Sequence, residues 1–180
     1  MDEPPAMRAA ALEAAFRRGR RRNALEEALP AAGYALLALL VAGPSYALPL
    51  GLVLFAAGAA LAYVGGDAST GVGPGLRAGL LPFAFAHVAS RAGHVCMAGG
   101  CTSLCMPACA LGGVLGGAYV AWRLGERRSG LGGWLVATAA VAGVGLMACQ
   151  CIGLGSLMGL MAGHLAGSAG LLLRPTLRAT

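Results

Sequence analysis

Six cysteines, gathered into two short segments, are the residues of this 180-residue chain with the clearest capacity for chemistry. Four stand in CMAGGCTSLCMPAC, residues 96–109, and two stand in ACQC, residues 148–151. Thiolate and imidazole groups suit soft or borderline metal ions such as Zn, Cu, Cd or Hg. The candidate ligands are Cys96, Cys101, Cys105, Cys109, Cys149, Cys151 and His94.

Three interpretations of these cysteines stay open on the sequence alone. They are thiols that respond to a metal ion or an oxidant, structural disulfides, or small apolar side chains that pack between helices. The chain has no CxxC pair and no complete zinc-ligand spacing, so a metal site is argued only from the number of soft ligands close together.

The composition predicts that these cysteines belong to a membrane protein. Hydrophobic residues make up 58% of the chain and charged residues 11%, whereas soluble domains carry about 25% charge. From about residue 31 to residue 173 the chain is apolar almost without interruption, in runs that reach the roughly 20 residues needed to cross a bilayer. The net charge of +6 comes entirely from arginine in a chain rich in Ala and Gly, so we expect no direct nucleic-acid binding.

Breaks in the apolar pattern predict an all-α, polytopic membrane protein: a bundle of six transmembrane helices with short loops. Turn-forming segments such as GPS, GGDASTGVGPG and GERRSG separate the spans. The expected spans are residues 25 or 31–42, 46–64, 76–99, 102–124, 131–149 and 154–173. The expected division is an arginine-rich segment at 1–30, a transmembrane domain at 31–173 and a tail at 174–180.

Arginine placement predicts the orientation, because positive residues in short loops stay in the cytoplasm. With both termini cytoplasmic in a bacterial inner membrane, twelve of the thirteen arginines lie inside and Arg91 is the exception. All six cysteines then lie at the outer side, where disulfides form. A cleaved signal peptide ending near SYA is the less favoured alternative, because another apolar span follows at once.

Several other residues are candidates for packing or function. Gly155, Gly159, Gly163 and Gly167 lie four apart, and with GGVLGG at 112–117 they predict close helix packing inside the chain, or a homo-oligomer face as the alternative. Ionisable side chains inside spans are costly and therefore functional candidates; they are His87, His164 and Arg91. A lone histidine in a bundle is more often hydrogen-bonded packing, whereas Arg91 could lower the pKa of nearby thiols.

The first thirty residues allow two interpretations. Their arginines would hold a solvated segment to anionic membrane lipid. Alternatively Met7, Leu12 and Phe16 form the thin apolar face of an amphipathic helix that docks a cytosolic partner.

A set of loosely spaced features runs from residue 91 to residue 178. They are a cysteine ahead of the fourth span (Cys96), the pair Met106 and Pro107, the loop RLGERR, the small-residue span VATAAVAGVGLMA, and a cysteine at its outer end (Cys151) followed by a final span and a terminal arginine.

In these features the chain resembles the NrsF-type anti-sigma factors, small six-span inner-membrane proteins. The resemblance implies that the cytoplasmic N-terminus sequesters a sigma factor and that cysteines corresponding to Cys96 and Cys151 sense stress. The family usually has His-Cys after the fifth span, where this chain has CQC with Gln150, and four cysteines are additional.

The leading hypothesis is therefore a non-enzymatic membrane stress sensor and anti-sigma factor. A metal ion or oxidant would bridge cysteines of the two outer turns, and the N-terminal segment would release its partner. A heavy-metal permease with thiol ligands and a membrane thiol oxidoreductase are the alternatives. No nucleotide-binding, hydrolytic or paired-carboxylate constellation is present in the sequence.

Overall fold

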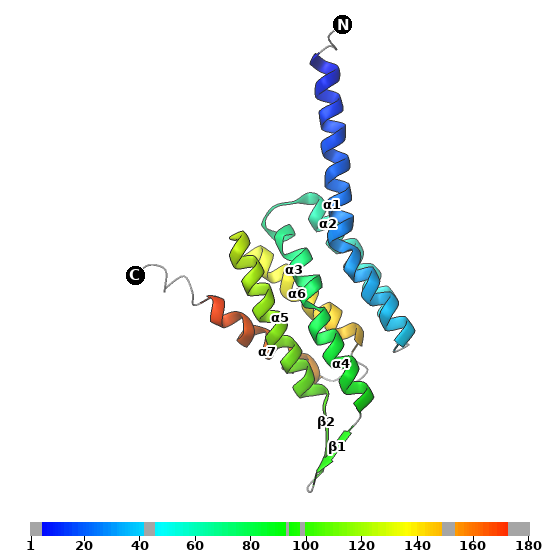
Figure 1. Ribbon diagram of the computed structural model, residues 1–180, viewed down its shortest axis with the longest axis vertical. Coiled ribbons are helices and arrows are strands. Elements are labelled where there is room, and N and C mark those ends of the chain that lie inside the picture. Colours follow the sequence, from blue (N-terminus) through cyan, green and yellow to red (C-terminus); the bar gives the residue numbers. More distant parts are fainter. Residues whose placement is uncertain (1–4, 42–45, 93, 98–99, 149–153, 173–180) are drawn as a thin grey trace, which may run out of the picture.

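A computed structural model describes residues 5–41, 46–92, 94–97, 100–148 and 154–172, and these are helical apart from one two-stranded hairpin and short connecting turns. The expected all-helical class is confirmed at this level, with the hairpin as an addition. In chain order the elements are α1 (Pro5–Val41), α2 (Ala47–Val64), the short 3₁₀ helix η1 (Asp67–Gly71), α3 (Val72–Ala78), α4 (Leu80–Ala92), β1 (His94–Met97), β2 (Gly100–Ser103), α5 (Cys105–Arg127), α6 (Leu131–Ala148) and α7 (Leu154–Leu172) (Figure 1).

Helix α1 is the longest element, and its N-terminal half projects beyond the rest of the molecule (Figure 1). Its C-terminal half packs beside α2 through a seam of buried alanines spaced four and three apart, which places them on one face. They are Ala24, Ala28, Ala31, Ala35 and Ala38. Pro30 lies inside the helix, where its missing N–H removes one backbone hydrogen bond, and α1 changes direction part-way along its length (Figure 1).

Helices α3 and α4 form one nearly continuous rod with an interruption at Gly79. The N–H of Gly79 still bonds to the carbonyl of Gly75, and the N–H of Phe83 bonds to that of Gly79. Pro82 has no N–H to donate to Ala78, so the helix loosens at this turn. The rod corresponds to the third expected span, and Gly79 lets it approach Val144 of α6 closely.

Helix α6 lies at the centre of the molecule and buries more than half of its residues, mostly small ones such as Ala137 and Gly143. It contacts α3, α4, α5 and α2. Helix α2 is equally apolar but buries only Ala47, Gly51 and Gly58. Leu52 and Val53 are 58% and 63% exposed on its outer surface.

Helices α2 and α6 are each long and apolar enough to cross a bilayer, as judged by length and composition within the described part of the chain. Each has 18 residues, a length of about 27 Å at 1.5 Å per residue. Their bounds agree with the second and fifth expected spans. The finding gives limited support for a membrane protein, and the crossing of all six expected spans stays a prediction.

Helices α5 and α7 make the most extensive contact among the described elements, with glycines of each helix set against the backbone of the other. A Cβ at Gly163 would overlap the carbonyl of Ala110, and one at Gly167 would overlap that of Val114. Gly113 faces Leu160 in the same way. The prediction that these glycines serve packing within the chain is confirmed, except that Gly155 has no neighbour within 4 Å.

Two expected boundaries differ from the structure. The first span is the C-terminal part of a helix that already begins at Pro5, so residues 5–30 and the span belong to one continuous, bent helix. The end of the third span and the start of the fourth were expected to be helical, but residues 94–103 contain a β-hairpin and α5 begins only at Cys105. From their four-residue spacing, Cys101, Cys105 and Cys109 were expected to line one face of a helix, and this is wrong for Cys101, which lies in strand β2.

Candidate functional site

The hairpin between α4 and α5 brings two of the predicted cysteines together. Strands β1 and β2 are antiparallel, and their register makes Cys96 the direct partner of Cys101, with His94 opposite Ser103. Directly opposed residues of an antiparallel pair have Cα atoms about 4.5 or 5.5 Å apart. Both separations fall within the range of about 4.4–6.8 Å that a disulfide spans. The backbone therefore presents Cys96 and Cys101 at a spacing suited to a disulfide.

The remaining cysteines lie in three different settings. Cys105 is the first residue of α5. Cys109 lies one turn later, is 4% exposed and belongs to the hydrophobic core, as the packing interpretation predicts for it. Cys149 and Cys151 lie outside the described residues. Among the residues that the structure does describe, no three His, Cys, Asp or Glu side chains are grouped to hold a metal ion. The metal site stays a prediction.

His164 of α7 is buried and hydrogen-bonded, which agrees with the more common role of a lone histidine in a bundle. It is 1% exposed, and its Nε2 lies 3.0 Å from Oγ1 of Thr138 on α6. The Thr138 hydroxyl donates to the carbonyl of Trp134 at 2.9 Å, so its oxygen is left to accept from Nε2–H. Ser168 donates to the carbonyl of His164 at 2.8 Å. This polar cluster joins α6 to α7.

The other two ionisable candidates lie on α4, near the hairpin. His87 is half-buried, and Arg91 is exposed in the last turn of the helix, three positions before His94. The last turn of α4, which carries Arg91, leads into the hairpin and lies far from the N-terminal half of α1 (Figure 1).

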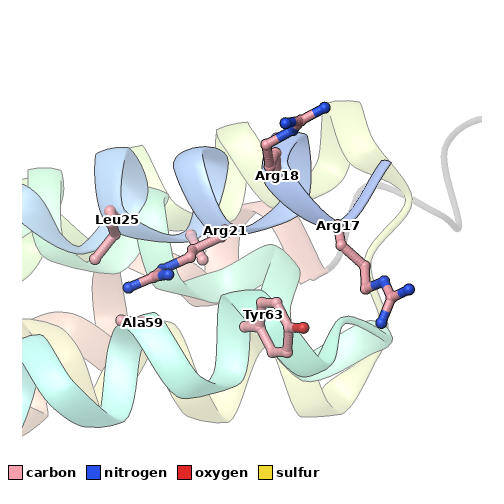
Figure 2. A pocket seen from close by; sticks show the side chains of 7 residues that line it. Arg17, Arg18, Arg21, Leu25, Ala59 and Tyr63 are labelled. Carbon is pink, nitrogen blue, oxygen red and sulfur yellow. The ribbon is translucent and has the colours of Figure 1, made fainter. Parts of the chain in front are cut away.

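A second candidate site is a groove between α1 and α2, which we call the arginine groove. It has a volume of about 540 Å³ and is shown in Figure 2. Its lining consists of Arg17, Arg18, Arg21, Ala24, Leu25, Ala59 and Tyr63. The side chains of Arg17 and Arg21 extend from α1 on either side of Tyr63, whereas Arg18 is directed away from α2 (Figure 2).

The charges of the groove are only partly balanced by acidic residues. Arg17 pairs with Glu13 at 3.3 Å, in a contact exposed on both sides. Within the described part of the chain, no carboxylate lies at ion-pair distance from Arg18 or Arg21. The groove thus combines an excess of positive charge with an alanine and leucine floor.

Arg20 fastens α1 to the end of α2 beside the groove. Its Nη2 donates to the carbonyls of Tyr63 and Val64, the latter at 2.9 Å, and its guanidinium lies 5.3 Å from the centre of the Tyr63 ring. Terminal carbonyls of a helix carry partial negative charge that a cation stabilises. Glu27 makes a second link, from α1 to Arg77 of α3 at 3.8 Å.

Asp67 of η1 joins the same end of the molecule to α6. Its carboxylate accepts the backbone N–H of Gly130 at 2.5 Å and that of Gly133 at 3.1 Å, at the start of α6. These bonds lower the pKa of the Asp67 carboxyl, because they stabilise its charged form. Asp67 therefore acts as a helix cap supplied from a segment more than sixty residues away in the sequence.

Comparisons with known proteins assign this chain to no family. The sequence matches no protein-family model, no curated protein and no solved structure. The resemblance to NrsF-type anti-sigma factors accordingly stays a prediction.

Tyr63, Arg20 and Asp67 were not singled out from the sequence. Asp67 carries the one available signal, because it stands in a turn-rich segment and aspartate favours helix N-termini. Its partners, however, lie in a distant loop. The groove likewise depends on α1 and α2 lying side by side at a particular register, and local sequence patterns do not encode that placement.

Proposed function

We propose that this chain is a multi-pass membrane protein that senses oxidants through Cys96 and Cys101 and signals to a cytosolic partner through the projecting half of α1. The observation that carries the proposal is the hairpin register, which pairs the two cysteines at the end of the molecule opposite to the N-terminus of α1 (Figure 1). An input and an output at opposite ends of an apolar bundle suit signalling across a membrane.

The exposed surface of α2 supports the membrane setting. A helix in the core of a soluble protein is apolar because it is buried, but α2 is apolar and buries only small residues. Helices α5 and α7 add exposed apolar side chains, such as Leu111 at 54% and Met158 at 63%. Large continuous apolar surfaces are rare on soluble monomers, whereas lipid covers them in a membrane protein.

The distribution of arginines supports a cytoplasmic N-terminus. Three contacts bring the N-terminal half of α1, the η1 segment and the α5–α6 turn to one end of the molecule. Arg20 contacts α2, Glu27 pairs with Arg77 on α3, and Asp67 bonds to Gly130. We call this the arginine end, since it also carries Arg123, Arg127 and Arg128. Positive residues remain on the cytoplasmic side, so the hairpin would face outward.

The proposed input is a thiol–disulfide exchange at the hairpin. A thiolate of the pair attacks a small-molecule disulfide such as oxidised glutathione, forming a mixed disulfide and releasing one glutathione thiol. The second cysteine then attacks the mixed disulfide and releases the other glutathione. The Cys96 and Cys101 thiols together lose two protons and two electrons, and the oxidised glutathione gains them. The outer side of a bacterial membrane is oxidising, so such a bond persists there.

The proposed output is the exposed N-terminal half of α1. Leu12 and Phe16 are one helical turn apart and are 72% and 61% exposed, and arginines follow at once. An apolar pair beside positive charge suits a partner with an apolar groove and an acidic rim. A sigma factor is the partner that the sequence resemblance implies, and it is part of the proposal.

The test uses the intact chain in membranes, with Cys96→Ser and Cys101→Ser as the test variants and Cys109→Ser as the matched control. Oxidised glutathione is applied, disulfides are mapped by peptide mass spectrometry, and sigma-factor-dependent transcription is measured in cells. We expect oxidation to link Cys96 to Cys101 and to change transcription in the original protein and in Cys109→Ser, but in neither hairpin variant.

An unchanged transcriptional response in Cys96→Ser and Cys101→Ser would remove these cysteines from the sensing role. A parallel treatment with cadmium separates metal sensing from oxidant sensing. If the original protein responds to cadmium but not to oxidised glutathione, and Cys96→Ser loses the cadmium response, then the sensed state is a metal-bound state and not a disulfide. Coupling requires that the ligand or bond favours one arrangement of the bundle over another, since equal affinity shifts no equilibrium.

A further inference from the structure

We propose that the arginine groove binds the phosphate headgroup of an anionic phospholipid from the leaflet at the arginine end. The inference rests on the membrane placement proposed above but is independent of the cysteine chemistry. It assigns a ligand class to a groove whose lining residues come from two helices and whose volume is about 540 Å³. Ligand sites in proteins commonly enclose volumes of about 300–1,000 Å³.

The groove lies at the depth where a headgroup would be found. Ala59 and Tyr63 belong to the last turns of α2, which is one of the two helices able to cross a bilayer. The end of a spanning helix coincides with the headgroup layer, and tyrosine is enriched there because its ring is apolar and its hydroxyl is polar. Tyr63 is 44% exposed in the groove.

The polar groups of the groove suit a phosphate. Arg17 and Arg21 are four residues apart on one face of α1 and flank Tyr63 (Figure 2). A guanidinium donates two parallel hydrogen bonds to phosphate oxygens, a geometry that an ammonium group lacks. Arg21 has no acidic partner among the described residues, and Arg17 has only the exposed contact with Glu13. Both guanidinium groups are therefore available to an anion.

Two apolar stripes lead away from the groove and favour a lipid over a soluble anion. On α2, helical spacing places Leu52, Ala56, Ala59 and Tyr63 on one face, and Leu52 is 58% exposed. On α1, Leu25 and Leu29 lie one turn apart and are 44% and 63% exposed. Acyl chains attached to a phosphate in the groove would lie along these stripes. Inorganic phosphate would leave them uncovered.

The bound lipid would brace α1 against α2 at the base of the projecting segment. Arg20, on the same turn of α1, already reaches the carbonyls of Tyr63 and Val64. The headgroup would add a second bridge between the two helices beside Tyr63. The direction in which the N-terminal half of α1 projects would then depend on the lipid composition of the membrane.

The test measures retained lipid by native mass spectrometry on the full chain purified in detergent. Phosphatidylglycerol and phosphatidylcholine with identical acyl chains are compared at increasing concentration. The variants are Arg17→Gln/Arg21→Gln, Ala59→Phe, which fills the groove without a change of charge, and the control Arg127→Gln/Arg128→Gln. The control removes the same charge from exposed positions at the same end of the molecule.

We expect the original protein and the control to retain phosphatidylglycerol in preference to phosphatidylcholine. Loss of two arginines from a phosphate site should weaken phosphatidylglycerol binding by about tenfold or more, and Ala59→Phe should weaken it as well. Equal phosphatidylglycerol retention by Arg17→Gln/Arg21→Gln would overturn the proposal. If Ala59→Phe still retains phosphatidylglycerol while Arg17→Gln/Arg21→Gln loses it, the arginines attract the lipid from the open surface and the groove is not its binding site.

Inorganic phosphate and glycerol 3-phosphate are added in a competition arm. If either displaces phosphatidylglycerol at equal concentration, the ligand is a soluble anion and the assignment to lipid is wrong. Loss of lipid binding would leave disulfide formation between Cys96 and Cys101 untouched, and loss of the disulfide would leave lipid binding untouched. The two proposals therefore fail separately.

Discussion

Single side chains hold distant segments of this molecule together, and Asp67 is the clearest case. The backbone N–H groups at the start of α6 have no partners within that helix, so they need acceptors from elsewhere. Asp67 supplies them from η1, with bonds to Gly130 and Gly133. A side chain at Gly130 or Gly132 would meet the carboxylate within 3 Å, so the glycines of this turn give Asp67 its access.

Replacement of Asp67 by asparagine should lower the melting temperature in a pH-dependent way. Its folded-state pKa lies below the ordinary value of 3.8, mainly because of the N–H groups of Gly130 and Gly133. A carboxyl with a depressed folded pKa contributes stability above its unfolded pKa and loses that contribution as the pH falls through the folded value. The difference in melting temperature between the original protein and Asp67→Asn should therefore be full above about pH 4–5 and shrink at lower pH.

The measurement is a thermal melt in detergent across that pH range. Glu13→Gln is the control, because Glu13 makes only an exposed pair with Arg17 within α1. It should leave the melting temperature nearly unchanged, as exposed ion pairs contribute little. A pH-independent difference for Asp67→Asn would show that the carboxylate charge does not stabilise the cap.

At the scale of elements, glycine determines how closely α5 and α7 approach. In the proposed membrane setting, helices gain little from the hydrophobic effect, so close backbone contact would be a main source of their association. Gly163 and Gly167 of α7 lie against the carbonyls of Ala110 and Val114 on α5. The buried Thr138–His164 contact adds a polar link from α6 to the same helix.

Alanine at Gly163 or Gly167 should therefore destabilise the fold by about 1–3 kcal/mol, because the new methyl group forces the helices apart. Gly155→Ala is the matched control on the same helix, since nothing lies within 4 Å of a Cβ there. The free energy of unfolding in mixed micelles measures the effect. Equal stability of Gly163→Ala and Gly155→Ala would contradict the close crossing.

The hairpin illustrates how an element can differ from its expected class. Cys101, Cys105 and Cys109 have helical spacing, yet the helix begins only at Cys105. Cys101 instead pairs with Cys96 across the strands. Because Cys101 lies in a strand, it faces Cys96 at the hairpin end of the molecule and does not share a helix with Cys105 and Cys109. This arrangement favours a disulfide within the hairpin over a site along α5.

At the scale of the whole molecule, the arginines and the cysteines of the described segments gather at opposite ends. The N-terminal half of α1 and the α5–α6 turn carry the arginines of one end, and the hairpin occupies the other (Figure 1). Arg91, near the hairpin, is the exception. An apolar middle between two polar ends is the arrangement that a bilayer requires.

This arrangement predicts which positions an impermeant thiol reagent reaches in intact, reduced cells. Cys96 should be labelled from outside. In a chain whose native cysteines are replaced by serine, Leu12→Cys and Gly125→Cys should be labelled only after the cells are permeabilised. Both positions are exposed and open in the structure, so lack of reaction in intact cells would reflect the membrane barrier. Labelling of Leu12→Cys in intact cells would reverse the proposed orientation.

The sequence by itself determined the helical class, the bounds of α2, α6 and α7, and the packing role of Gly159, Gly163 and Gly167 on α7. These features follow from local properties: apolar run length, turn residues, and side-chain size at helical spacing. Its prediction of hydrogen-bonded packing for His164 also held, because a buried imidazole needs a partner whatever the fold.

Only the tertiary structure decided that Cys96 faces Cys101, that Asp67 caps α6, and that Arg17 and Arg21 share a groove with Tyr63. Each of these depends on the relative position of segments that are separate in the chain. The packing of the whole molecule determines the strand register, the cap supplied from another loop and the alignment of the two helices. No short window of residues contains that information.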